Sequence, residues 1–174
     1  MRVQEAMSRD VQTCRPWEEL NRAAQLMWEH DIGFVPVVGD SGTVLGVVTD
    51  RDACMAAYTR GLPLAAMRVE DVMSRDVETC APGSDLKIAL ELMRETRVRR
   101  LPIVDADGGL VGVLSVADLA RVAEDLMRRG DRDLACDAAM TVASICEPRF
   151  GKSEPPIQSS ARRVAVRKAG AIAG

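Results

Sequence analysis

The stretch GVVTDRD, residues 46–52, returns as GVLSVAD at residues 112–118, which is 66 positions later. Each copy begins with a glycine in an apolar run and ends on an aspartate three residues after a threonine or serine. The same offset relates MSRDV at Met7 to MSRDV at Met73. Recurrence at one fixed spacing indicates an internal repeat of a structural unit.

The repeat extends through most of the chain. Setting residues 3–58 against residues 69–124 without a gap gives 21 identities in 56 positions. We therefore expect two copies of one fold, at 3–62 and 63–130, and a C-terminal extension at 131–174 that is partly helical or irregular. A copy of under about 65 residues buries little surface alone, so the two are expected to pack about a pseudo-twofold axis and share one core.

Each copy is expected to form a βαββα unit, which makes the fold class α+β. In the first copy, four apolar residues follow the i, i+3, i+4, i+7 spacing of one helical face, namely Leu20, Ala23, Ala24 and Met27. Short β-branched runs flank this helix, and the turn residues of GDSG join the last two runs as a hairpin. The expected strands are VQTC (11–14), FVPVV (34–38) and VLGVVT (44–49), and a second helix begins near Thr49.

The second copy repeats this pattern. Ser84 is the expected N-cap of its first helix, whose apolar stripe consists of Leu86, Ala89, Leu90 and Met93. LPIV (101–104) and LVGVLS (110–115) are the expected hairpin strands on either side of DADGG. The second helix begins near Ser115, with one apolar side formed by Leu119, Val122, Ala123 and Leu126.

Composition limits the class of protein. The 174 residues are 47% hydrophobic and 28% charged, which is typical of one compact domain or two small ones. With a net charge of −3 and a pI of about 5.3, the chain has no electrostatic drive toward nucleic acid or anionic lipid. No run of about 18 apolar residues predicts a membrane span, and the first residues lack the apolar core of a signal peptide. We expect a cytoplasmic protein.

The five cysteines, at 14, 54, 80, 136 and 146, include no C-x-x-C pair, so reduced thiols are expected. Cys14 and Cys80 occupy equivalent places, and we expect them either to approach the pseudo-twofold axis or to fill matching core positions. The single histidine, His30, is expected at a helix end on the surface rather than in a site. No metal site is predicted, although a metal or thiol sensor stays open as an alternative.

The last segments differ in composition from the repeats. EPRFGKSEPPIQSS (147–160) contains three prolines and is typical of a linker, and ARRVAVRKAGAIAG (161–174) is basic. We expect the basic end to be a solvated helix or frayed chain rather than an arm for nucleic acid or an acidic partner.

The motif shared by the two copies has two interpretations. A Thr or Ser at an N-cap with an acidic residue three positions later is close to a capping box, and the acid complements the helix dipole. Alternatively, the glycine before each motif would let another molecule approach the backbone, and an open helix N-terminus binds anions. The two roles are compatible.

The tandem copies, the proline-led amphipathic helix after each MSRDV, HDIGFVPVV and RVRRLPIVD, and above all GVVTDRD and GVLSVAD resemble a pair of CBS (cystathionine-β-synthase-type) domains, a Bateman module. The match covers residues 3 to about 127 and is similar to small stand-alone bacterial proteins made of one such pair. The resemblance implies paired βαββα repeats, often dimerised into a flat disc. It also implies clefts that bind adenosine-containing ligands such as AMP, ADP, ATP or S-adenosylmethionine.

The resemblance assigns candidate ligand-binding residues. The aspartate of each motif would accept both ribose hydroxyls, because a carboxylate is an acceptor only. The hydroxyl residue and the free N–H groups would face a phosphate, and Arg51 adds a cation. Adenine would rest beside Asp52, near Val11 to Thr13 and Ile32 to Pro36, where proline leaves ladder groups unpaired. The full set is Thr49, Arg51, Asp52, Ser115, Asp118, Thr13, Ile32, Gly33, Phe34, Pro36, Thr79, Val98, Arg99, Arg100 and Pro102.

The copies differ within the motif. The charged pair at 50–51 becomes VA at 116–117, so the second copy keeps the ribose acceptor and loses the cation. The arginines at 99–100 would compensate, but neighbouring strand residues face opposite ways, so only one is expected to reach a cleft. We expect the Asp52 site to prefer phosphorylated adenosine and the Asp118 site to be weaker or to take a less charged ligand.

These features favour a regulatory module that binds its ligand between the repeats and signals, by conformational or dimer change, to a protein that the sequence does not name. The alternative is a structural or assembly pair without a ligand. No Ser/His/Asp or Cys/His set stands out, so we expect no catalytic residue and no enzyme activity. A homodimer is expected, with no cofactor beyond the ligand and no nucleic-acid or membrane partner.

Overall fold

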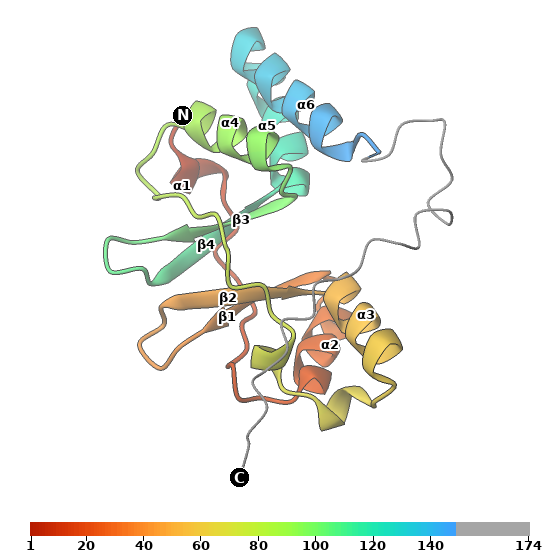
Figure 1. The fold of residues 1–174 in the computed structure, drawn as a ribbon. Helices are drawn as coiled ribbons and strands as arrows, with labels where there is room; N and C mark the ends of the chain where they lie inside the picture. Colours follow the sequence, from red (N-terminus) through yellow and green to blue (C-terminus); the bar gives the residue numbers. More distant parts are fainter. Residues whose placement is uncertain (149–174) are drawn as a thin grey trace.

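Two similar halves lie with their β-hairpins next to each other and their helices at opposite ends (Figure 1). The structure is a computed structural model and describes residues 1–148. The basic segment 161–174 and most of the proline-rich segment before it lie outside these residues. The expected α+β fold, with paired repeats, is confirmed.

The first half follows the predicted order. Helix α2 (Leu20–Glu29) buries an apolar stripe that consists of Leu20, Ala23, Leu26 and Met27. Strands β1 (Phe34–Val38) and β2 (Val44–Thr49) pair antiparallel around the GDSG turn. Helix α3 (Asp50–Arg60) begins directly after Thr49, its N-cap. The helical stripe, the β-branched runs and the turn residues therefore place these elements as the sequence predicts.

The second half contains α4 (Leu86–Thr96), β3 (Arg100–Val104), β4 (Leu110–Ser115) and α5 (Val116–Arg129). The N-cap of α4 is Asp85, whose carboxylate accepts the Lys87 N–H at 3.0 Å, so the prediction of Ser84 is wrong. Asp85 directly precedes the first helical residue, and its side chain therefore reaches the free N–H groups of the first turn.

Residues 11–14 do not form the predicted strand. Cys14 alone makes a parallel bridge, to Val37 on β1, and Cys80 makes the corresponding bridge to Ile103 on β3. The chain before Cys14 does not pair with its own half, because Ser8 makes an antiparallel bridge to Val113 on β4 of the other half. Each first strand is thus reduced to one bridging residue.

The two halves exchange short segments at the MSRDV sequences. The Ser8 N–H donates to the Val113 carbonyl on β4, and the Val113 N–H donates back to the Ser8 carbonyl, both at 2.9 Å. Ser74 and Val47 make the same two bonds, also at 2.9 Å. The segment that leads into each half therefore extends the hairpin of the other half.

Gly46 and Gly112 allow this exchange. A Cβ on Gly112 would lie 2.8 Å from the Ser8 carbonyl oxygen and 2.6 Å from the sulfur of Met7, and one on Gly46 would lie 2.7 Å from the Ser74 carbonyl oxygen. These distances leave no room for a methyl group. The interpretation that the motif glycines admit another molecule is therefore wrong, because the backbone that approaches them belongs to the same chain.

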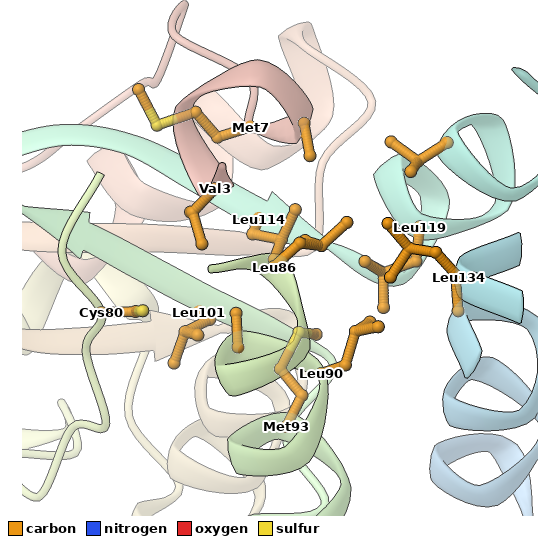
Figure 2. Close-up of a cluster of buried hydrophobic side chains, with 14 of the residues drawn as sticks. Val3, Met7, Cys80, Leu86, Leu90, Met93, Leu101, Leu114, Leu119 and Leu134 are labelled. Carbon is orange, nitrogen blue, oxygen red and sulfur yellow. The ribbon is translucent and has the colours of Figure 1, made fainter. Parts of the chain in front are cut away.

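The structure has two hydrophobic clusters, so the predicted single shared core is wrong. The second half's cluster includes Val3, in α1 (Val3–Ala6), and Met7, which directly follows α1. Both side chains pack among Leu86, Leu101 and Leu114 (Figure 2). The first half's cluster takes Met67, Val69 and Met73 from around the 3-10 turns η1 (Leu64–Ala66) and η2 (Val69–Asp71). Each core is completed by the other copy, which explains why the halves are expected to fold as a pair.

The C-terminal extension begins with helix α6 (Arg132–Cys146), capped by Asp131. It lies beside α4 and α5 (Figure 1) and adds four residues to the second cluster, namely Leu134, Ala135, Ala138 and Ile145. The first half has no such helix within residues 1–148. None of the helices in this range combines the length and apolar character that crossing a membrane takes.

Cys14 and Cys80 are buried, one in each cluster, and therefore fill matching core positions. Burial, the largest cause, and the nearby Glu18 carboxylate together raise the pKa of the Cys14 thiol to about 12, against the lowering effect of Arg22. A thiol with this pKa stays protonated at neutral pH, so Cys14 is unsuited to act there as a thiolate.

We expect Gly112→Ala to lower the free energy of unfolding by about 1 to 3 kcal/mol, because the added methyl group forces the crossing segment away from β4. Gly83→Ala is the control, since nothing lies within 4 Å of a Cβ at that position. Urea unfolding of both variants measures the difference. Equal stability of the two variants would contradict a close approach at Gly112.

Candidate functional site

Both repeated motifs form capping boxes. Thr49 Oγ1 accepts the Asp52 N–H at 3.2 Å, and Asp52 Oδ2 accepts the Thr49 N–H at 2.9 Å. Ser115 and Asp118 make the same two bonds at 3.2 and 2.7 Å. The capping interpretation is therefore confirmed for both copies, and binding must use whatever capacity the caps leave free.

The carboxylate of Asp118 is fully engaged. Its side chain is 4% exposed. Oδ2 accepts both the N–H and the hydroxyl of Ser115, while Oδ1 accepts the Ser8 hydroxyl at 2.8 Å and a guanidinium N–H of Arg121. A carboxylate offers about four lone-pair positions, so these donors fill all of them.

Asp52 keeps an oxygen free. Its Oδ2 accepts the N–H and the hydroxyl of Thr49, but no hydrogen bond within residues 1–148 reaches Oδ1. Ser74, the counterpart of Ser8, donates nothing to Asp52 in this range, and Met55 stands where the second copy has Arg121. The two motifs therefore share a cap but differ in what surrounds the second carboxylate oxygen.

A cavity of about 650 Å³ lies between the halves beside Asp118. Its volume falls within the range of small-molecule sites. One wall comes from the segment after the crossing point and from the end of α2, and the other comes from the start of β3 and the start of α5. The lining residues are Ser8, Asp10, Val11, Gln12, His30, Asp31, Ile32, Phe34, Asp50, Arg99, Arg100, Val113, Ser115, Val116, Ala117, Asp118 and Arg121.

The cavity brings together six of the predicted site residues, namely Ile32, Phe34, Arg99, Arg100, Ser115 and Asp118. The other nine do not line it, namely Thr13, Gly33, Pro36, Thr49, Arg51, Asp52, Thr79, Val98 and Pro102. Val11 and Ile32 were expected in the same site as Asp52, but they line the cavity that contains Asp118 and not Asp52. The crossing of Ser8 onto Val113 carries Val11 toward the other half's motif, whereas Ile32 stays in the first half and also lines the groove beside α3.

Both Arg99 and Arg100 line the cavity, so the prediction that only one of them reaches a cleft is wrong. Strand β3 begins at Arg100, and the alternation of strand side chains therefore does not apply to Arg99. The Arg100 guanidinium carbon lies 5.8 Å from the centre of the Phe34 ring, within the range of a cation–π contact.

Arg121 is a third guanidinium in the cavity, and the sequence interpretation missed it. Its position three residues after Asp118, on the same helical face, was the available signal. Three exposed carboxylates, from Asp10, Asp31 and Asp50, also line the cavity. His30 is the exposed C-cap of α2, as expected, and lies on the cavity wall as well.

A second, mostly apolar groove of about 380 Å³ lies between α2 and α3. Its lining residues are Ala24, Met27, Trp28, Ile32, Asp50, Ala53, Cys54, Ala57 and Leu64. The corresponding helix pair of the second half, α4 and α5, packs against α6. Among residues 1–148, no three His, Cys, Asp or Glu side chains are placed to share a metal ion.

Comparison with known proteins links this arrangement to one family. The family model of the CBS domain matches residues 3–58 and 69–129. CBS domain-containing protein YhcV of Bacillus subtilis is 36% identical over 118 residues, which is 68% of this chain and 82% of that protein. The inosine-5'-monophosphate dehydrogenase of Methanocaldococcus jannaschii is 30% identical over 168 residues. That match covers 95% of this chain but only 32% of the enzyme.

Solved structures show the same fold. CBSX2 in complex with AMP superposes with a TM-score of 0.65 at 29% identity, covering 72% of this chain and 98% of CBSX2. Hypoxic Response Protein I, with two coordinated zinc ions, gives a TM-score of 0.63 at 30% identity, covering 70% of this chain and 98% of that protein. The paired-repeat architecture is thus shared with proteins whose bound molecules differ.

Removing the two motif carboxylates is expected to have unequal effects on stability. Asp118→Ala should cost about 2 to 3 kcal/mol of unfolding free energy, because it removes the cap of α5 together with the hydrogen bonds from Ser8 and Arg121. Asp52→Ala should cost about 1 kcal/mol, the value of a helix cap. Urea or thermal unfolding measures both, and equal losses would contradict the additional role of Asp118.

Proposed function

Because the chain belongs to the CBS domain family, we propose that it is a regulatory module that binds an adenosine-containing ligand in the cleft beside Asp118. The observation that carries the proposal is the 650 Å³ cavity, which residues of both halves line and which holds three arginines. The complex of CBSX2 with AMP, at 29% identity, supports an adenine nucleotide as the ligand.

The chemistry of the cavity fits a phosphorylated ligand. Val11, Ile32 and Phe34 offer apolar contact to a base. The guanidinium groups that line the same cavity suit phosphate oxygens, which they bind through charge-assisted hydrogen bonds. The sequence favoured the Asp52 site for phosphorylated adenosine because the second motif lacks an arginine. The arginines that flank the second motif in space lead us to propose the Asp118 cleft instead.

We propose regulation rather than catalysis. The match to the dehydrogenase covers about a third of that enzyme, so its activity does not carry over to this chain. A ligand that contacts both halves favours the packing it fits best, and a regulated protein partner would detect that packing. All five cysteines are unpaired, which suits a reducing compartment, and we propose a cytoplasmic location.

AMP is expected to stabilise the folded protein, by about 2.7 kcal/mol at a concentration 100 times its Kd. Arg99→Ala combined with Arg100→Ala should weaken AMP binding about ten- to hundredfold, because charged hydrogen bonds are lost. Arg51→Ala is the matched control, since Arg51 is exposed and does not line the cavity. Calorimetric titration of AMP, ATP and S-adenosylmethionine measures these affinities.

Two results would contradict this proposal. Loss of AMP binding in Arg51→Ala but not in the double variant would move the ligand to the Asp52 side. No binding of any of the three ligands by the wild-type protein would favour the structural or assembly alternative.

We also propose that the protein is a homodimer that associates through the groove between α2 and α3. Trp28 and Tyr58 on these helices are 88% and 81% exposed, and exposed aromatic side chains beside an apolar groove are typical of an interface. In the second half α6 packs on the equivalent pair, α4 and α5, which supports a packed partner on α2 and α3.

Trp28→Ser is expected to shift the protein from dimer to monomer without unfolding it, because the side chain is exposed within one chain. Leu45→Ser, at an exposed apolar residue on β2, should leave the oligomeric state unchanged. Sedimentation velocity distinguishes the two outcomes. A wild-type monomer, or a dimer that survives Trp28→Ser, would contradict the proposed interface.

A further inference from the structure

We propose that Arg121 competes with ligand hydroxyl groups for Asp118 and so makes the cleft select anionic over neutral adenosine ligands. The inference rests on the function proposed above and concerns the specificity of the same cleft. Arg121 lines the cavity and donates to Asp118 Oδ1. Arg121 would therefore determine specificity in two ways. In the protein without ligand it occupies an acceptor position of Asp118, and in the complex it contacts the phosphate of the ligand.

The first step concerns the acceptor capacity of Asp118. Four donors already fill its lone-pair positions, two from Ser115, one from Ser8 and one from Arg121. A ribose diol brings two further O–H donors to the same group. At least one protein donor must leave before a sugar hydroxyl can bind to Asp118.

The second step identifies the donor that leaves most easily. Both Ser115 donors belong to the cap of α5, and breaking them would open the helix N-terminus. The Ser8 hydroxyl can rotate away from Asp118, although its backbone is fixed by two 2.9 Å bonds to Val113, but it frees only one of the two Oδ1 positions that a ribose diol would fill. The Arg121 side chain is 71% exposed, and its bond to Asp118 is its single hydrogen bond within residues 1–148. Arg121 is therefore the donor that a ligand displaces.

The third step follows the displaced guanidinium. It remains on the cavity wall, beside the space where a ligand sits. A phosphate group replaces the carboxylate as its partner, so a nucleotide restores the charge-assisted bond that it broke. Adenosine offers no anion and loses that bond without replacement. The discrimination arises from the exchange of one anionic partner for another.

The first copy provides an internal comparison. Met55 occupies the position equivalent to Arg121, and Oδ1 of Asp52 accepts no hydrogen bond within residues 1–148. A sugar hydroxyl could bind that oxygen without displacing a cation. The competition is thus a property of the Asp118 motif and not of the repeated fold.

Calorimetric titration with adenosine and with AMP tests the inference. For the wild-type protein, AMP is expected to bind more tightly than adenosine. In Arg121→Ala the ratio of the adenosine Kd to the AMP Kd should fall at least tenfold, with tighter adenosine binding and weaker AMP binding. Arg121→Gln, which keeps a polar donor on a shorter stem and removes the charge, should also lower the ratio. Met55→Ala is the matched control and should leave the ratio unchanged.

The outcomes separate this inference from the proposed function. If wild-type protein binds AMP and both Arg121 variants keep the wild-type ratio, Arg121 does not determine specificity and the proposed function stands. If adenosine binding weakens in Arg121→Ala, the competition at Asp118 is also wrong. If wild-type protein binds neither molecule, the proposed function fails and this inference fails with it.

Discussion

The structure depends on the exchange of two short segments between its halves. The backbone pairs formed by Ser8 with Val113 and by Ser74 with Val47 attach the lead-in of each half to the hairpin of the other. This attachment completes both hydrophobic clusters with residues of the opposite copy. It also places the Ser8 hydroxyl on Asp118 and brings the next residues into the cleft. Folding and the candidate site therefore follow from one set of contacts, which explains why the two motif glycines carry no side chain.

Features that depend on neighbouring residues in the chain could be predicted from the sequence, whereas the exchange could not. Both hairpins and both capping boxes lie where period, turn residues and motif spacing put them. MSRDV, however, is identical in the two copies, so it carries no information about which hairpin it joins. The sequence therefore did not predict that Val11 follows the crossing into the cleft beside Asp118, or that the motif glycines admit a segment of the same chain. Arg121 was missed because it lies one helical turn after the motif ends, and only residues within the motif were considered as partners of Asp118.

The two capping boxes show that a repeated motif does not guarantee a repeated site. A carboxylate has about four acceptor positions, and a helix cap uses part of them. What remains depends on residues outside the motif, which are Ser8 and Arg121 in the second copy and Ser74 and Met55 in the first. Stability and binding therefore draw on the same oxygen atoms at Asp118. A ligand that binds to them competes with Ser8, the donor from the other half, as well as with Arg121, which links occupancy to packing between the halves.

Helix α6 makes the response to such a ligand unequal between the halves. Its residues enlarge the second cluster to 18 buried residues, against 13 in the first. The helix pair α4 and α5 is supported on its outer side, whereas α2 and α3 expose an apolar groove. Regions with fewer buried contacts move at lower free-energy cost. A ligand in the cleft touches both halves, so any change in packing should fall mainly on the first half. That half also presents the exposed aromatic residues Trp28 and Tyr58, and a change there would reach whatever surface packs against them.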